Sequence, residues 1–193
     1  VGGGLAVTYD DEAPADVERF AAGVIEATRG LDVTLVLEPG RFLVAEAGLL
    51  LTRVLFRKRS GGKEYVITDA GMNDLLRPSH YEAYHRIDAV APSGAEVVAD
   101  IVGPVCESGD FLALDRRTDD APPGALLAVR TTGAYGFSMA SNYNAPATRG
   151  GARRRRALRG RHGARALRGS GAPGARRARV ALRVSAPPTE RPA

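Results

Sequence analysis

Two glycine-containing segments near the start of the sequence carry groups that could bind a cofactor. Glu38-Pro39-Gly40-Arg41 follows an apolar run and places a carboxylate, a glycine and an arginine within four residues. These groups could serve a cofactor that has both a basic nitrogen and a phosphate, and they could equally form a salt-bridged turn. Gly2-Gly3-Gly4 could let backbone N–H groups approach a phosphate, or could be a flexible terminus.

A third candidate is the loop from Gly103 to Asp110, which carries Cys106 next to Glu107. A lone cysteine is more often a small buried residue than a reactive one, but a polar Gly/Pro-rich loop and a neighbouring carboxylate favour exposure. Cys106 is the only cysteine in the chain. It therefore cannot form an intramolecular disulfide, and we expect a reducing, cytoplasmic setting.

The segment from Leu76 to His85 combines cations with aromatic side chains. Arg77 and Tyr81 are four residues apart and would share a face if the segment is helical. His80 and His85 are five apart, a poor spacing for two ligands on one helix, so we predict them at the surface or behind a functional residue. Since these histidines and Cys106 form no tight ligand cluster, we predict no metal site.

A last candidate is Gly133-Ala134-Tyr135-Gly136, where small residues surround one tyrosine. This pattern is typical of a close backbone turn with a projecting phenol. A β-bulge with a packed aromatic side chain has the same pattern.

The elements that must position these residues differ between the two parts of residues 1–144. Residues 14–30 predict a helix from apolar residues at helical spacing, and residues 33–37 predict a strand buried on both faces. A glycine-rich turn, a helix and a buried strand form a βα unit of a parallel barrel. We therefore predict that residues 1–44 are the C-terminal part of a TIM-type α/β barrel.

Residues 45–144 have no long helical period, and their apolar runs predict strands instead. Residues 50–59 and 64–69 read as two strands joined by a hairpin turn at Ser60-Gly61-Gly62-Lys63. Further strands are predicted at 96–102, 111–114 and 126–131. The prediction is an antiparallel β-barrel or sandwich domain, which makes the chain α+β as a whole.

Residues 145–193 form a basic tail of unlike composition. They hold 14 arginines, no lysine and one acid, so their net charge is +13, whereas residues 1–144 carry 13 basic and 21 acidic residues. The tail has no Phe, Tyr, Ile or Met and predicts disorder. It could bind nucleic acid, or be an extension without a role. We favour a third interpretation, a GC-rich gene read out of frame after Asn144, because such codons yield Arg, Ala, Gly and Pro.

The sequence gives no sign of a membrane or secretory segment. No stretch approaches the roughly 20 apolar residues that span a bilayer. The first residues lack the basic and apolar regions of a signal peptide. The opening within a glycine-rich motif, without methionine, indicates a chain cut at its front.

Taken in order, these motifs resemble the diaminopimelate decarboxylases, which belong to the fold-type III PLP-dependent decarboxylases. That family pairs an α/β barrel with a C-terminal β domain. The resemblance covers residues 1–144 and ends at the arginine-rich tail. The motifs that carry it are Gly2-Gly3-Gly4-Leu5, Glu38-Pro39-Gly40-Arg41, Asp69-Ala70-Gly71-Met72-Asn73, Arg77-Pro78 with Tyr81, Gly103-Pro104-Val105-Cys106-Glu107-Ser108, and Gly133-Ala134-Tyr135-Gly136 with Ser141-Asn142-Tyr143-Asn144.

The resemblance implies a cofactor site for pyridoxal 5'-phosphate (PLP). Gly2, Gly3 and Gly4, the last most directly, would bind its phosphate. Glu38 would face the pyridinium nitrogen, and Pro39, Gly40 and Arg41 would complete the site. A carboxylate beside the ring nitrogen keeps it protonated, so that the ring can accept electrons when CO₂ leaves.

The resemblance also implies a substrate site. Arg41, Arg77 and Tyr81 would hold the distal carboxylate of an amino-acid substrate, and Glu107 would pair with its distal ammonium. Cys106 would protonate Cα after decarboxylation. Tyr135 would contact both substrate and cofactor. In the family the cysteine loop reaches into the barrel of a second copy, so a homodimer with shared active sites is expected.

The implied reaction converts meso-2,6-diaminopimelate to L-lysine and CO₂. Ornithine or arginine decarboxylases of the same fold are the alternative, but the ornithine type carries aspartate after the cysteine and lacks the Arg77/Tyr81 pair. The family's Schiff-base lysine lies early in the barrel and has no counterpart in this sequence. We therefore expect the chain alone to be inactive. A non-catalytic protein, regulatory or nucleic-acid-binding, is the competing class.

Overall fold

The chain is described by a computed structural model, which covers residues 1–144 and 181–182. These residues fall into two compact units: one holds residues 1–4, 16–39 and 181–182, and the other holds residues 5–15 and 40–144. The predicted disorder of residues 145–193 lies outside the described residues, apart from 181–182.

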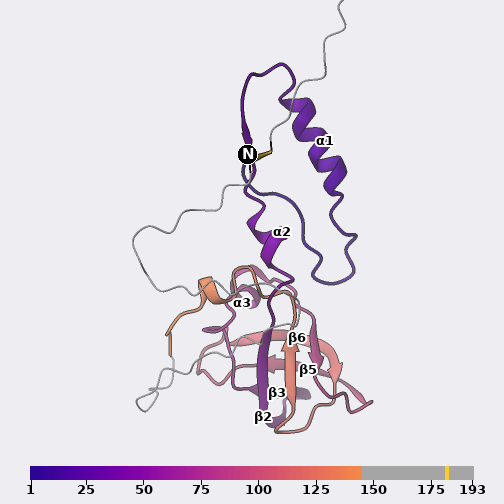
Figure 1. The fold of residues 1–193 in the computed structure, drawn as a ribbon. Coiled ribbons are helices and arrows are strands. Elements are labelled where there is room, and N and C mark those ends of the chain that lie inside the picture. The colour runs from indigo at the N-terminus through magenta and orange to yellow at the C-terminus, as the bar shows by residue number, and fades with distance from the viewer. Residues whose placement is uncertain (145–180, 183–193) are drawn as a thin grey trace, which may run out of the picture. The chain divides into compact units, whose positions relative to one another are not determined.

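The first unit consists of one helix and a two-stranded sheet (Figure 1). Helix α1 spans Val17–Ala27, and it begins there because the Asp16 carboxylate accepts a hydrogen bond from Arg19 N at 2.8 Å. Strand β1 (Leu35–Val36) pairs antiparallel with β8 (Ala181–Leu182). The helix is shorter than the predicted 14–30, because Thr28 ends it and bonds back through its hydroxyl to Val24 O at 2.8 Å.

The first unit buries little apolar surface within the described residues. No residue of α1 is buried. The prediction that residues 33–37 form a strand buried on both faces is wrong for this structure: Val33 is 59% exposed and Val36 is 39% exposed. Such a strand needs neighbours on each side, and the described residues pair β1 with β8 alone.

The second unit is built on a six-stranded mixed sheet with the order β4-β7-β2-β3-β5-β6. The edge strands β4 and β6 contact each other, so the sheet is nearly closed into a barrel. All neighbours pair antiparallel except β3 and β5, which run parallel. The strands are β2 (Leu50–Ser60), β3 (Lys63–Thr68), β4 (Ile87–Ala89), β5 (Glu96–Val102), β6 (Phe111–Asp119) and β7 (Leu126–Val129).

The parallel pair corrects the prediction of a purely antiparallel domain. Between β3 and β5 the chain forms helix α3 (Arg77–Tyr81) and strand β4, which lies at the far edge of the sheet. The chain therefore returns beside β3 in the same direction after a crossover instead of a hairpin. The three residues of β4 were too few to give a strand pattern in the sequence.

Alternation along the strands sends one face into a shared core. Val54 and Val66 from β2 and β3, Ile101 from β5 and Leu112 from β6 are each at most 1% exposed. The turn between β2 and β3 is the predicted hairpin. Gly61 and Gly62 have φ of +58° and +80°, the left-handed conformations that a two-residue turn of type I′ requires.

Two glycines allow the end of the sheet to meet helix α2 (Gly40–Val44) at very close range. Gly133 N donates to Ala45 O at 2.9 Å, and Thr132 N donates to Gly48 O at 3.0 Å. A Cβ atom on Gly133 would overlap the Val44 carbonyl, and one on Gly48 would overlap the Gly133 backbone. This contact fixes the Gly133–Gly136 loop against the helix that carries Arg41.

Helices in the described part of the chain are short. The longest, α1, has 11 residues, and no helix among the described residues combines the length and the apolarity needed to cross a bilayer.

Replacing Gly133 by alanine is expected to lower the free energy of unfolding by about 1–3 kcal/mol. The added Cβ meets backbone carbonyls, which cannot rotate away as a side chain could. Gly40→Ala is the matched control, since a Cβ there meets nothing within 4 Å. Urea unfolding of the 193-residue chain measures both. Equal effects of the two changes would contradict the close packing.

Candidate functional site

Arg77 lies at the centre of a buried cluster in the second unit. Its side chain is 8% exposed, although it starts the short helix α3. The guanidinium carbon lies 4.7 Å from the ring centre of Tyr9 and 6.0 Å from that of Tyr135. Contacts of this kind stabilise a cation that has lost water. A guanidinium held between aromatic rings can present its remaining N–H groups to an anion.

His85 holds the other side of Arg77. Arg77 Nη1 lies 3.0 Å from His85 Nε2, and His85 Nδ1 lies 2.9 Å from Arg130 O. A guanidinium can only donate and a carbonyl can only accept, so Nε2 is the acceptor and Nδ1 carries the hydrogen. The imidazole is therefore neutral and has one defined tautomer.

The environment of His85 favours this neutral form. The residue is fully buried, and burial above all lowers the pKa of its imidazole. The charges of Arg77 and Arg116 lower that pKa further, while the hydrogen bond to the Arg130 carbonyl acts in the opposite direction. The sequence predicted His85 either at the surface or behind a functional residue. In the structure it is buried behind Arg77. His80 is exposed.

Tyr9 is a member of the cluster that sequence reasoning did not find. Its ring meets that of His85 edge-on, with centres 5.2 Å apart. Its hydroxyl oxygen is buried and has no hydrogen-bond partner in the part of the chain that the structure describes. The sequence gives no local signal for this role, because Tyr9 and Arg77 are brought together only by the fold.

Cys106 lies in the loop between β5 and β6 and is exposed, as its polar neighbours indicated. Glu107 N donates to Val105 O at 2.9 Å, so Cys106 is the middle residue of a three-residue turn. A Cβ on Gly109 would lie 3.6 Å from Ser79 Cβ, at ordinary contact distance. The loop therefore packs on α3, the helix that begins with Arg77.

Glu107 accepts a hydrogen bond from the segment that follows Gly133-Ala134-Tyr135-Gly136. The Tyr143 hydroxyl donates to Glu107 Oε2 at 3.0 Å, and this bond raises the pKa of Tyr143. Ser141 N donates to Asn73 O at 2.9 Å. These contacts bring the Ser141–Asn144 motif, the Asp69–Asn73 motif and the cysteine loop together.

The other residues predicted to bind the substrate are more exposed to solvent. Tyr81 is 59% exposed and stacks edge-on against His80, with ring centres 4.5 Å apart. Tyr135 is 48% exposed and has φ of +61°. A left-handed tyrosine is uncommon. Arg41 is half-buried in α2.

In the first unit, the glycine run lies beside the end of β1. The Val1 amino group donates to Val36 O at 2.8 Å, and a Cβ on Gly3 would lie 3.4 Å from Glu38 O. Gly4 has φ of +100°, which a side chain would strain. The two predicted cofactor motifs of this unit, Gly2–Gly4 and Glu38, are thus neighbours.

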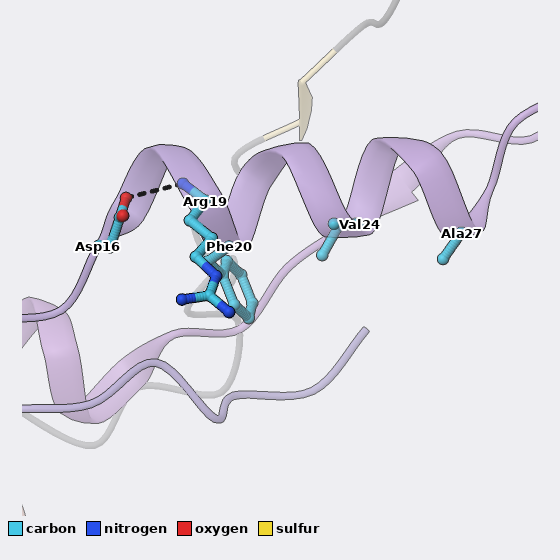
Figure 2. Close-up of a pocket in the computed structure, with 6 residues that line it drawn as sticks. Asp16, Arg19, Phe20, Val24 and Ala27 are labelled. Atoms are coloured by element: carbon cyan, nitrogen blue, oxygen red, sulfur yellow. Dashed lines mark hydrogen bonds between the residues drawn. The ribbon is translucent and has the colours of Figure 1, made fainter.

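A shallow hollow also runs along one face of α1, and none of the predicted site residues lines it (Figure 2). Its lining comes from α1 and its cap alone: Asp16, Arg19, Phe20, Gly23, Val24 and Ala27. Phe20, Val24 and Ala27 point the same way in Figure 2. The hollow is therefore the apolar face of one helix.

The comparisons with known proteins agree with this arrangement. Residues 7–133 match the family described as "Pyridoxal-dependent decarboxylase, C-terminal sheet domain". The chain belongs to this family. It is 52% identical over 145 residues to a diaminopimelate decarboxylase of Pseudomonas aeruginosa, covering 75% of this chain and 35% of that protein.

Solved structures show the same similarity. The chain matches diaminopimelate decarboxylase of Helicobacter pylori, solved with L-lysine, at 48% identity and a TM-score of 0.70, covering 74% of this chain and 36% of that one. It also matches a lysine/ornithine decarboxylase of Vibrio vulnificus, solved with cadaverine, at 26% identity and a TM-score of 0.67, covering 75% and 40%. The chain spans about a third of the length of the curated relatives it matches.

The state of His85 predicts a loss of stability in acid. Its pKa is lowered in the folded chain, so the unfolded chain takes up a proton first as the pH falls below about 6.5. The contribution of His85 to the free energy of unfolding is therefore fully present above that pH, and it is lost as the pH falls through the lowered pKa. Melting temperatures measured between about pH 7.5 and pH 5 should show this decline.

Two variants separate His85 from other titrating groups. His85→Gln keeps one acceptor and one donor, so it should retain fold at neutral pH while losing part of the acid sensitivity. His80→Gln, at an exposed position, should keep the full acid sensitivity. The same pH curve for all three proteins would contradict the buried neutral imidazole.

Proposed function

We propose that this chain supplies the C-terminal part of a PLP-dependent enzyme that converts meso-2,6-diaminopimelate to L-lysine and CO₂. The observation that carries the proposal is Arg77, a buried cation fixed by Tyr9, Tyr135 and neutral His85. The substrate differs from simpler diamino acids by a second carboxylate, and a pre-positioned guanidinium is the group that binds one.

The residues of the first unit fit a role at the cofactor. PLP, when bound, supplies a ring that accepts the electrons released with CO₂. The Gly2–Gly4 run has little bulk and lies beside Glu38. Gly2, Gly3 and Gly4 would hold the phosphate through their backbone, with Pro39 and, from the second unit, Gly40 and Arg41 completing the site. The Glu38 carboxylate would keep the pyridine nitrogen protonated.

The residues of the second unit would hold the far end of the substrate. Arg77 would bind the distal carboxylate, with Arg41 and Tyr81 as further donors. The Tyr9 hydroxyl, which is buried on the ring that contacts the guanidinium, would be an additional donor. Glu107 would pair with the distal ammonium, and its bond from Tyr143 orients the carboxylate for this. Tyr135 would contact both substrate and cofactor.

Cys106 would deliver the proton that replaces CO₂ at Cα. Its thiol is exposed at the middle of a tight turn, next to the carboxylate proposed to hold the ammonium. One loop would then both recognise the substrate and protonate it. The family's homodimer, in which this loop reaches into the partner's barrel, is part of the proposal. A cytoplasmic setting, for a biosynthetic enzyme with a free thiol, is part of it as well.

The Schiff-base lysine would have to come from outside these residues. Lys58 and Lys63 are the only lysines in the sequence, and both belong to the β2–β3 hairpin. Lys63 is paired with Asp115 and Asp100, and the hydrogen bond to Asp115 raises the pKa of its ammonium. A lysine held in its charged form is a poor nucleophile. We propose that an α/β barrel preceding this part of the enzyme supplies the lysine.

An ornithine- or arginine-type decarboxylase is the alternative function. The fold does not separate the two, since the Vibrio vulnificus structure superposes about as well as the Helicobacter pylori one. The residues favour diaminopimelate: glutamate follows Cys106, and Arg77 is buried and oriented.

The activity is tested by joining the N-terminal part of the Pseudomonas aeruginosa relative to the whole 193-residue chain. The fusion should show the visible absorbance of bound PLP and release CO₂ from meso-2,6-diaminopimelate, while the chain alone should do neither. Faster CO₂ release from ornithine than from diaminopimelate would overturn the proposed substrate, and turnover by the chain alone would overturn the proposed source of the lysine.

In the fusion, Arg77→Met is expected to lower kcat/KM for diaminopimelate by about a hundredfold, because one partner of a buried charge pair is lost. L-Lysine, the product, keeps the distal carboxylate and should inhibit the variant much more weakly, whereas cadaverine, which has no carboxylate, should inhibit both proteins about equally. Arg86→Met is the matched control, since Arg86 is exposed and paired with Asp88. An equal loss of inhibition by lysine and by cadaverine would contradict the role of Arg77 in recognising the carboxylate.

A further inference from the structure

Asp110 ends the loop that carries Cys106 and Glu107, and it is buried although it is charged. The residue is 4% exposed. Its carboxylate accepts hydrogen bonds from Met72 N at 2.7 Å and from Val105 N at 2.6 Å. A buried carboxylate is costly unless donors satisfy it, so these two backbone groups define where it can lie.

The backbone of Asp110 closes the same loop. Gly103 N donates to Asp110 O at 3.0 Å, and Asp110 N donates to Glu107 O at 3.0 Å. Cys106 thus lies between two residues that Asp110 binds: Val105 before it, through the carboxylate, and Glu107 after it, through the backbone N–H. One residue sets the path of the chain on both sides of the thiol.

Two glycines make room for this carboxylate. A Cβ on Gly71 or on Gly103 would overlap the Asp110 oxygens, and one on Gly103 would also meet Gly71 Cα. Neither glycine has a positive φ, so the reason for glycine here is close approach and not backbone conformation. The carboxylate lies in a cradle formed by the Asp69–Asn73 turn and the neck of the cysteine loop.

The turn on the other side of this cradle is itself fixed to the sheet. Ala70 N donates to Thr52 Oγ1 at 3.0 Å, and Thr68 Oγ1 donates to Ala70 O at 2.8 Å. Leu75 N donates to Gly71 O at 3.0 Å, and the chain then enters α3 at Arg77. Asp110 therefore ties the loop of Cys106 to the segment that leads into Arg77.

We propose that Asp110 is a positioning residue that fixes the path of the loop that carries Cys106 and Glu107. This inference rests on the proposed function. Glu107 would hold the distal ammonium of diaminopimelate in the partner's barrel, so the path of this loop decides where the substrate can lie. The same bonds aim the Cys106 proton at Cα, because the thiol and Glu107 are adjacent on one constrained turn.

The first test measures amide hydrogen exchange, residue by residue, on the full 193-residue chain. In Asp110→Asn the amide can accept from one N–H but turns its NH₂ group toward the other. Exchange at Val105 or Met72, or at both, should therefore rise at least about tenfold. Val66 in the sheet should be little changed. Ser108→Ala, an exposed change in the same loop, should leave the protection of both amides as it was.

The second test uses Asp110→Ala, which leaves a space of carboxylate size beside Gly71 and Gly103. Added formate should restore part of the protection at Val105 and Met72, because it returns a carboxylate to the same two donors. Formate should have no effect on the wild-type chain. Restoration by formate is a result that a purely steric role of the side chain would not give.

The third test is kinetic and uses the fusion enzyme. Asp110→Asn should raise KM, through Glu107, and lower kcat, through Cys106, with a loss in kcat/KM of about ten- to a hundredfold. If the fusion enzyme with its natural Asp110 releases no CO₂, the proposed function is refuted. The exchange tests would still decide whether Asp110 holds the loop.

Three results would overturn the inference. The first is unchanged exchange at Val105 and Met72 in both variants. The second is loss of protection throughout the sheet in both variants, because Asp110 would then be required for folding and not for placing one loop. The third is unchanged kinetic constants in an Asp110→Asn fusion that has lost the local protection.

Discussion

A buried guanidinium needs a hydrogen-bond acceptor, and in this chain a neutral imidazole provides it. Arg77 donates to His85, and His85 donates in turn to the Arg130 carbonyl, so the direction of each bond follows from which atoms can donate. A carboxylate in place of His85 would neutralise the cation. A neutral acceptor fixes its position and leaves its charge available to an anionic ligand.

The loops that meet at this cation are placed by backbone-to-backbone approach. Gly133 meets the end of α2, and Gly71 with Gly103 encloses the Asp110 carboxylate. A side chain on Gly133 would collide with backbone atoms, and one on Gly71 or Gly103 would collide with the buried Asp110 carboxylate. Short motifs separated in sequence are therefore held at fixed spacing without a large hydrophobic contact between them, which suits loops that must keep polar groups accessible.

Sequence patterns predicted the elements well where local rules decide them. The hairpin at Gly61-Gly62 and strand β5 follow from turn chemistry and alternation. The parallel pairing of β3 and β5 depends on a crossover, which no local pattern encodes. Motif order pointed to Arg77 and Cys106, but not to Tyr9 or Asp110. Their roles depend on contacts with residues distant in sequence, and a buried aspartate has the same local signature as an exposed one.

The two units divide the proposed chemistry between them. The sheet unit encloses its own core, with Val54, Ile101 and Leu112 almost fully buried, and it carries the residues proposed to recognise the substrate. The unit with Glu38 has a helix without a single buried residue. Apolar helix faces are stable when covered, so we propose that barrel elements pack on α1 and fix the geometry of the proposed cofactor residues. We therefore propose that substrate recognition is structured in this chain, while cofactor binding and catalysis depend on the barrel proposed to precede it.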